Sequence, residues 1–243
     1  MLMDSKAYTS WKSWSAECFG LCERTQRDYF RSEIRRTNLN FANDIRALEI
    51  GFGNGSFLSY ARSQGWSVDG LEVIEALVEQ AKEHGFSAYH SSKIASLGRS
   101  SYNLIVAFDV FEHLIEQDLD TLLSDVWCLL CVGGCLVARF PNGDSPFGLE
   151  GQNGDPTHVT AIGVSKMCYY AKKYGFDVIY LGGEACPFPA GNAGRTIRAL
   201  FTLPIRWGVD FFVKNIFLPG SGVSFSSRNT TVVLRKAMPM GCS

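Results

Sequence analysis

The middle of the chain alternates short apolar runs with stretches in which apolar residues recur every three or four positions. The runs predict buried strands, and the periodic stretches predict amphipathic helices. Strands are predicted at residues 45–50, 67–73, 87–90, 102–109, 134–140, 177–182 and 229–237, and helices at 56–65, 74–85, 116–131 and 165–176. This order indicates an α/β protein with a parallel sheet covered by helices on both faces.

Two segments lie outside this alternation. Residues 8–36 are rich in aromatic and charged side chains, and we expect them to form helices over the edge of the sheet. Residues 197–220 are apolar but contain several charges, which argue against a transmembrane span. After Pro204, Arg206, Asp210 and Lys214 recur at every fourth position, so the predicted helix has one charged stripe beside an apolar one.

Three closely spaced glycines, Gly51, Gly53 and Gly55, follow the first predicted strand. Open α/β sheets bind ligands at the carboxyl ends of their strands, and glycine lets backbone amides approach a ligand closely. The spacing is GxGxG, with Ser56 in the sixth position, and this disfavours the GxGxxG fingerprint of nicotinamide-dependent oxidoreductases. Glu49 would crowd a pyrophosphate but can hold an ammonium group. The loop therefore favours a nucleotide-like ligand that carries an amino acid.

A second acidic residue, Glu72, ends the second predicted strand. An acceptor at that place can take hydrogen bonds from both ribose hydroxyls of a nucleotide. Asp69 is the weaker candidate because it precedes the apolar end of the strand. The expected ligand thus has a ribose and an amino group, and S-adenosylmethionine has both.

The chain resembles the class I S-adenosylmethionine-dependent methyltransferases in the motifs LEIGFGNG, VDGLEVIEALVEQAKEHGF, NLIVAFDVFEHL and LLCVGGCLVARFPNG. The resemblance covers roughly residues 45–182 and implies a Rossmann-like, doubly wound sheet of seven mostly parallel strands, the last one antiparallel. It places Glu49 and the glycine loop around the methionine part, Glu72 at the ribose and Val73 beside the adenine. The cofactor-binding residues that it implies are Glu49, Gly51, Phe52, Gly53, Gly55, Glu72, Val73 and Asp109. Where many relatives carry an acidic residue after the third strand, this chain has HSSKIASL.

We expect an N-terminal helical cap at residues 1–44 and a methyltransferase domain at residues 45–243. A basic amphipathic insertion is expected at residues 195–220. The chain is 46% hydrophobic and 19% charged, as globular proteins are. Its net charge of −1 hides a basic end, because residues 195–236 hold seven lysines and arginines against one aspartate. That end could face an anionic surface.

Methyl transfer requires an aligned nucleophile and often a base, because the sulfonium methyl group is already activated. His158, in GDPTHVT after the fifth strand, is the first choice for the base, since an imidazole is partly neutral at cellular pH. Asp155 precedes it by three residues and could orient it or the substrate. His113, after the fourth strand, is a further candidate, although histidines at such a helix start more often serve structure.

A divalent metal ion is an alternative use of the motif DVFEH. Asp109, Glu112 and His113 resemble the carboxylate-carboxylate-histidine group of quinone O-methyltransferases, and oxygen-rich ligands suit Mg²⁺. The same dipeptide EH also occurs in relatives with no known metal. Cys128 and Cys131 form a CxxC without a second pair at zinc-site spacing, so buried thiols are the better interpretation.

The acceptor and the location are predicted from looser signals. FPNGDSPFG and GDPTHVT resemble a methyltransferase subfamily associated with cell-surface polysaccharide and glycolipid synthesis, which implies O-methylation of a sugar or glycolipid. A quinone or other small metabolite, and an inactive cofactor-binding partner subunit, are the alternatives. Residues 195–218 could contact a membrane as an interfacial helix, or serve as a lid or dimer helix. The chain shows no signal peptide or nucleic-acid motif, so we expect a cytoplasmic protein, either free or peripheral at the inner face of a membrane.

Overall fold

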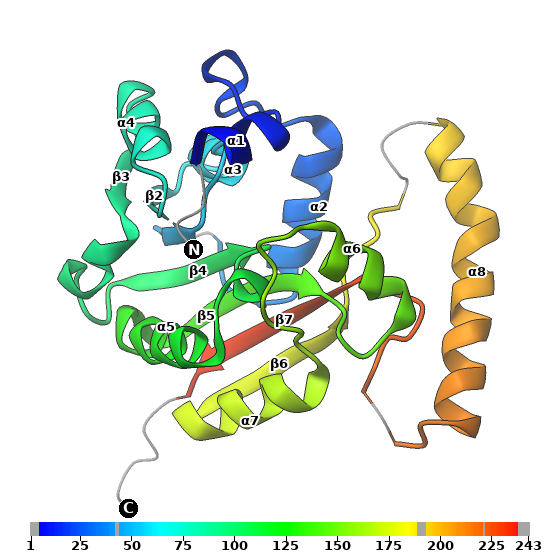
Figure 1. Ribbon diagram of the computed structural model, residues 1–243. Helices are drawn as coiled ribbons and strands as arrows, with labels where there is room; N and C mark the ends of the chain where they lie inside the picture. The colour runs from blue at the N-terminus through cyan, green and yellow to red at the C-terminus, as the bar shows by residue number, and fades with distance from the viewer. Residues whose placement is uncertain (1–4, 42–43, 189–192, 221, 238–243) are drawn as a thin grey trace, which may run out of the picture.

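A computed structural model describes residues 5–41, 44–188, 193–220 and 222–237, and it contains one seven-stranded sheet in the order β3-β2-β1-β4-β5-β7-β6 (Figure 1). Strand β7 runs antiparallel to both β5 and β6, and the other neighbouring strands are parallel. The strands are β1 (Arg46–Ile50), β2 (Ser67–Glu72), β3 (Ser87–His90), β4 (Tyr102–Phe108), β5 (Leu130–Pro141), β6 (Phe176–Gly183) and β7 (Asn229–Lys236). The predicted fold class is confirmed.

The helices of the alternating region form close to their predicted positions. The helices are α1 (Ser5–Trp11), α2 (Arg24–Arg35), α3 (Ser56–Ser63), α4 (Glu75–Glu83), α5 (Glu116–Leu129), α6 (Leu149–Gly154), α7 (Val164–Tyr174) and α8 (Ala193–Ile216). Strand β5 begins at Leu130, earlier than predicted, because Leu130 pairs with Tyr102 before a register shift that accommodates the following glycines. The expected cap and domain also include residues 1–4, 42–43, 189–192, 221 and 238–243, which lie outside the described residues.

Alternating side chains of the strands supply two separate core layers. In β1, Leu48 and Ile50 pack in the layer that contains the apolar residues of α5 and α7. Ala47 packs in the opposite layer with residues of α2 and α3. Successive strand residues point to opposite faces, so this sheet is covered on both sides as the long apolar runs predict.

The sequence of the N-terminal segment suggested helices that cover an edge of the sheet. In the structure the segment makes wider contacts. Phe30 and Ile34 of α2 are four residues apart and pack together in the core layer on one face of the sheet. Trp14 and Phe19, between α1 and α2, lie against the loop that follows β1. The segment is therefore built onto both the sheet and the predicted ligand loop.

The strand order creates a switch point between β1 and β4. From β1 the chain continues to β2 and β3 on one side, and β4 and β5 lie on the other side. Ligands of open α/β sheets bind at such a point, beside the carboxyl ends of the strands. The glycine loop after β1 and the motif DVFEH after β4 both lie there. Among the helices that the structure describes, none is long and apolar enough to cross a membrane.

Candidate active site

The glycine loop is closely packed and strongly turned. Gly51 has φ +70° and Gly53 has φ +51°, in the left-handed region that glycine adopts without strain. A Cβ atom on Gly51 would lie 2.6 Å from Val110, and one on Gly53 would lie 2.8 Å from the Trp14 ring. The Gly51 N–H donates to the carbonyl of Leu71 at 2.7 Å. Both positions therefore require glycine for conformation and for space.

Glu72 is held in place by backbone amides at the end of β2. Its carboxylate accepts hydrogen bonds from the N–H groups of Gly53 at 3.0 Å, Val73 at 2.7 Å and Ile74 at 3.2 Å. Burial raises the pKa of Glu72, and these N–H groups oppose the rise. The carboxylate thus joins the glycine loop to the end of β2, where a ribose is expected. The Val73 side chain beside it is 62% exposed.

Glu49 is a buried carboxylate with an incomplete set of partners. Its side chain is on the penultimate residue of β1, only 5% exposed, and its Oε2 has no hydrogen-bond partner among the described residues. Burial raises its pKa well above the ordinary value, and the charge of Glu72 adds to the effect. A buried acid with one unpartnered oxygen fits a ligand with an ammonium group, such as the amino group of S-adenosylmethionine.

The end of β3 carries a residue that the sequence motifs did not single out. His90 approaches the carbonyl of Val73 with Nε2 at 3.1 Å and Ser92 Oγ with Nδ1 at 2.9 Å. An imidazole bound to the backbone therefore begins the segment that follows β3. The sequence signal that could have identified His90 was its position at the end of a predicted strand, two residues before Ser92.

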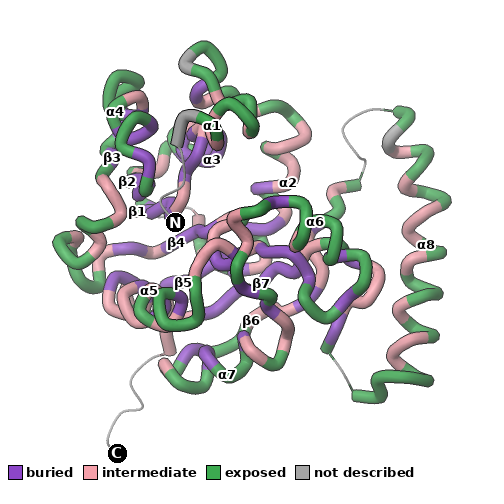
Figure 2. The backbone as a smooth tube through the Cα atoms, in the orientation of Figure 1, coloured by how far each residue is buried: buried purple, intermediate pink, exposed green. Residues whose placement is uncertain are grey.

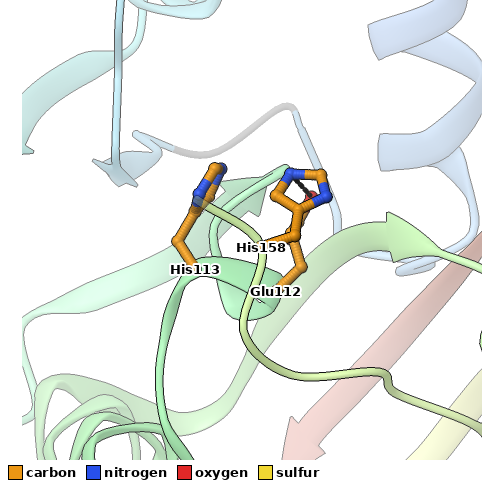
Figure 3. A group of neighbouring side chains, drawn as sticks. All are labelled: Glu112, His113 and His158. Atoms are coloured by element: carbon orange, nitrogen blue, oxygen red, sulfur yellow. Dashed lines mark ion pairs between the residues drawn. The ribbon is translucent and has the colours of Figure 1, made fainter. Parts of the chain in front are cut away.

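The predicted catalytic residues lie together beside the switch point. Glu112 and His113 come from the short turn after β4, and His158 comes from the loop after α6 (Figure 3). His158 Nε2 lies 3.8 Å from Glu112 Oε1 and 3.7 Å from Asp155 Oδ2. The ring centroids of His113 and His158 are 4.6 Å apart. The side chain of His158 is 7% exposed, so the group is largely shielded from water.

Thr157 links His113 to Asp155 and fixes the proton positions. Its hydroxyl donates to Asp155 Oδ1 at 2.5 Å and therefore accepts from His113 Nδ1–H at 2.8 Å. His113 Nε2 is then left with a free lone pair. Burial lowers the pKa of His113, and the charge of a protonated His158 lowers it further.

Asp155 is ionised at neutral pH. Partial burial acts to raise its pKa, but hydrogen bonds from Thr157 and the charge of Lys12 outweigh burial and bring the pKa to about 2. Lys12 Nζ lies 3.0 Å from Asp155 Oδ2. Asp155 can therefore stabilise a positive charge on His158 and also holds the N-terminal segment at the site.

Glu112 is the most isolated acid of the group. It is 1% exposed, and neither carboxylate oxygen has a hydrogen-bond partner among the described residues. Burial, with a smaller contribution from the charge of Asp109, raises its pKa to about 8. Its backbone carbonyl accepts the N–H groups of Val159 at 2.8 Å and Thr160 at 3.1 Å, so it also fixes the loop that carries His158.

Asp109 is held apart from the group by Arg139. It adopts φ +57° at the end of β4, and its carboxylate accepts a hydrogen bond from Arg139 Nε at 2.9 Å. The residues whose ligand atoms lie within 4.8 Å of one another are Glu112, His113 and His158, so His158 takes the place expected of Asp109. Two imidazoles and one carboxylate suit a transition-metal ion, whereas Mg²⁺ prefers oxygen ligands.

The N-terminal segment supplies further residues at the site that sequence patterns did not identify. Besides the ion pair of Lys12, the ring of Tyr8 packs edge-on against His113 with centroids 6.4 Å apart. Trp14 packs edge-on against Tyr8 at 5.8 Å and covers Gly53. The spacing of the aromatic residues suggested helices, but nothing in the sequence indicated that they would lie over the glycine loop and the histidines.

Solved structures share this fold. An S-adenosylmethionine-dependent methyltransferase from Archaeoglobus fulgidus is 21% identical, with a TM-score of 0.63 over 86% of this chain and 94% of that one. An S-adenosylmethionine-dependent methyltransferase from Mesorhizobium loti is 14% identical, with a TM-score of 0.60 over 86% and 97% of the two chains. The cyclase SpnF is 15% identical, with a TM-score of 0.58 over 88% and 82%. At these identities the likeness establishes the fold and leaves the reaction open.

Sequence comparison gives the family. No curated protein matches the chain. The family model described as a methyltransferase domain matches residues 22–181, well over half of the chain. The matched region contains the glycine loop, Glu72 and the group around His158. The chain therefore belongs to the methyltransferase domain family, and the predicted class of enzyme is confirmed.

Proposed function

We propose that the protein transfers a methyl group from S-adenosylmethionine to a hydroxyl oxygen of a sugar or glycolipid. The observation that carries this proposal is Glu49, a buried carboxylate without a complete set of partners beside a glycine loop. The amino group of the cofactor supplies the missing partner. Glu72, already oriented by three backbone amides, offers acceptors for the ribose hydroxyls.

His158 is the proposed base. When bound, S-adenosylmethionine supplies an electrophilic methyl group, and the acceptor oxygen must lose its proton as it attacks. The imidazole of His158 takes that proton, and the ionised Asp155, whose Oδ2 is 3.7 Å from Nε2, stabilises the resulting positive charge. The shielded position of His158 strengthens this electrostatic effect. His113 positions Asp155 through Thr157.

A sugar acceptor is favoured by the polar loop that borders the group. Residues 141–158 join β5 to His158 and present exposed polar side chains such as Asp144 and Asn153, whereas Asn142 and Ser145 are buried and donate to backbone carbonyls of the protein. If the sugar is carried by a lipid, residues 195–218 would contact the inner face of a membrane. The protein would then be cytoplasmic and peripheral.

A quinol or another aromatic metabolite is the second candidate acceptor. The aromatic side chains of Tyr8 and Trp14, which lie over His113 and Gly53, are the observation that favours it. A flat ring could pack against them. Parallel assays with sugar and quinol acceptors distinguish the two proposals.

Calorimetry with S-adenosylhomocysteine, the product of the cofactor, tests the cofactor site. Glu49→Gln should weaken binding by about tenfold or more, because it removes the charge that pairs with the ammonium group. Glu75→Gln, on the exposed side of α4, is the matched control and should bind normally. Absence of binding to the wild-type protein would refute the proposal.

Methyl transfer from labelled cofactor to sugar and glycolipid acceptors tests the base. His158→Gln should lower turnover by about 10²-fold or more, with S-adenosylhomocysteine affinity unchanged. A variant with the wild-type rate would remove His158 from this role. Cofactor binding without turnover on any acceptor would identify the inactive partner subunit instead.

A further inference from the structure

Helix α8 carries an apolar face that points away from the protein. The face is formed by residues that recur at helical spacing and fall on one half of the helix surface at about 100° per residue. These side chains, each more than half exposed, are Ile197, Leu200, Phe201, Ile205, Trp207, Phe211, Phe212 and Ile216. The largest exposures are 78% for Trp207, 71% for Phe211 and 70% for Phe201. We call this set the α8 apolar face.

The opposite side of α8 is the one that contacts the protein. Asp210 Oδ1 accepts the N–H of Ser226 at 2.6 Å, and Arg206 lies 3.5 Å from Cys186 Sγ. None of the α8 residues whose burial the structure describes is fully buried (Figure 2). An ordinary surface helix turns its apolar stripe inward and its charges outward. Helix α8 shows the reverse arrangement.

The charges of α8 indicate what covers the α8 apolar face. Arg198 and Lys214 are cationic and lie at the two margins of this face, whereas Arg206 and the one acid of the helix, Asp210, contact the protein. Aromatic and aliphatic side chains flanked by lysine and arginine suit the boundary between the headgroups and acyl chains of an anionic bilayer. A second copy of the chain would bring the same excess of positive charge, so it is the poorer match.

The position of α8 in the fold relates this face to the active site. Helix α8 follows β6 and precedes β7, and β6 runs parallel to β5 because both pair antiparallel with β7. The chain therefore leaves for α8 at the carboxyl edge of the sheet, the edge that also carries the glycine loop and His158. With 24 residues, α8 is about 36 Å long and can lie along a surface.

We propose that α8 binds in the plane of an anionic bilayer through the α8 apolar face and holds the carboxyl edge of the sheet beside the membrane. The inference deepens the proposed function, because an acceptor with a lipid part would then reach the site without leaving the bilayer. The binding itself rests on α8 alone. Its test therefore does not depend on methyl transfer.

Flotation of the full chain with vesicles tests this proposal. Vesicles of phosphatidylcholine with about 30% phosphatidylglycerol should carry the protein upward, and pure phosphatidylcholine should carry much less. The variant Phe201→Gln, Trp207→Gln and Phe211→Gln keeps the net charge and a good helix former at each position. It should bind the anionic vesicles at least about tenfold more weakly. Equal flotation of variant and wild type would overturn the proposal.

A matched variant controls for the general loss of apolar surface. Val132→Gln, Tyr169→Gln and Val178→Gln change three exposed apolar side chains outside α8 and should leave flotation unchanged. Raising the salt concentration should weaken wild-type binding, because it screens the attraction to the anionic headgroups. Equal binding to neutral and anionic vesicles would contradict the assigned lipid chemistry.

A second copy of the chain is the alternative occupant of the α8 apolar face, and the oligomeric state tests it. Analytical ultracentrifugation of the wild type without vesicles should show a monomer, and the α8 triple variant should sediment identically. A wild-type dimer that the triple variant abolishes, together with no flotation, would overturn the lipid assignment. Calorimetry with S-adenosylhomocysteine should give equal affinities for both proteins, so a failed cofactor site remains distinguishable from a failed membrane site.

Discussion

At the scale of single residues, Glu112 makes the stability of the protein depend on pH. Its pKa is about 8 in the folded chain and 4.5 when unperturbed. Between these values the folded state keeps a proton that the unfolded state has lost, so stability falls as the pH rises. The ionised form is disfavoured because the carboxylate is buried and Asp109 lies near. Arg139 and Lys12 oppose this effect without cancelling it.

Replacing Glu112 with Gln removes the titration. Between about pH 5 and pH 8, the free energy of unfolding of the wild type should fall. The fall for Glu112→Gln should be smaller by roughly 1 to 3 kcal/mol. Urea unfolding at each pH measures the difference, with Glu75→Gln on the exposed side of α4 as the control. Parallel pH profiles for Glu112→Gln and the wild type would show that burial of Glu112 does not cause the pH dependence of stability.

At the scale of elements, the N-terminal segment and the glycine loop form one unit. A methyl group at Gly53 would be strained at φ +51° and would lie 2.8 Å from the Trp14 ring. At Gly65, φ is +79° and no atom lies within 4 Å of the added carbon. Gly65→Ala therefore reports the backbone strain alone, at about 1 kcal/mol. Gly53→Ala adds the collision and should cost about 2 to 4 kcal/mol in unfolding free energy.

A double-mutant cycle with Trp14→Ala isolates the contact. The alanine removes the ring that the new methyl group meets, so Gly53→Ala should cost less in the Trp14→Ala background, by about 1 kcal/mol or more. Strictly additive effects in thermal or urea unfolding would show that the segment does not press on the loop. Gly65→Ala combined with Trp14→Ala should be additive and serves as the control.

The elements themselves were largely predictable from the sequence, because each depends on local periodicity. The strand β1 and its glycine loop, for example, appear as a buried run followed by three closely spaced glycines. The contacts between distant elements were not predictable. Lys12 and Asp155 are 3.0 Å apart in the structure, yet no pattern in either segment specifies the other. The pairing of Asp109 with Arg139 was unpredictable for the same reason. Because of that pairing, the third member of the group with Glu112 and His113 is His158 and not Asp109.

At the scale of the whole molecule, stability and surface chemistry are carried by different parts. The charged and apolar stripes of α8 were visible in the sequence, but only the fold decides which one faces the protein. Large apolar side chains are buried in the layers around the sheet, where Leu123 of α5 is 0% exposed. The apolar side chains of the α8 apolar face meet solvent instead. They therefore contribute little to the folding of the chain in the absence of a partner surface.

This division predicts opposite responses to substitution. Phe201→Gln, Trp207→Gln and Phe211→Gln together should change the free energy of unfolding by no more than about 1 kcal/mol, because these side chains are exposed in both the folded and the unfolded state. Leu123→Ala alone should cost about 2 to 5 kcal/mol, since it leaves a cavity in a closed layer. Urea unfolding without vesicles compares the two. A large loss in the α8 variant would mean that α8 packs on the protein through the α8 apolar face, and the outward orientation would be wrong.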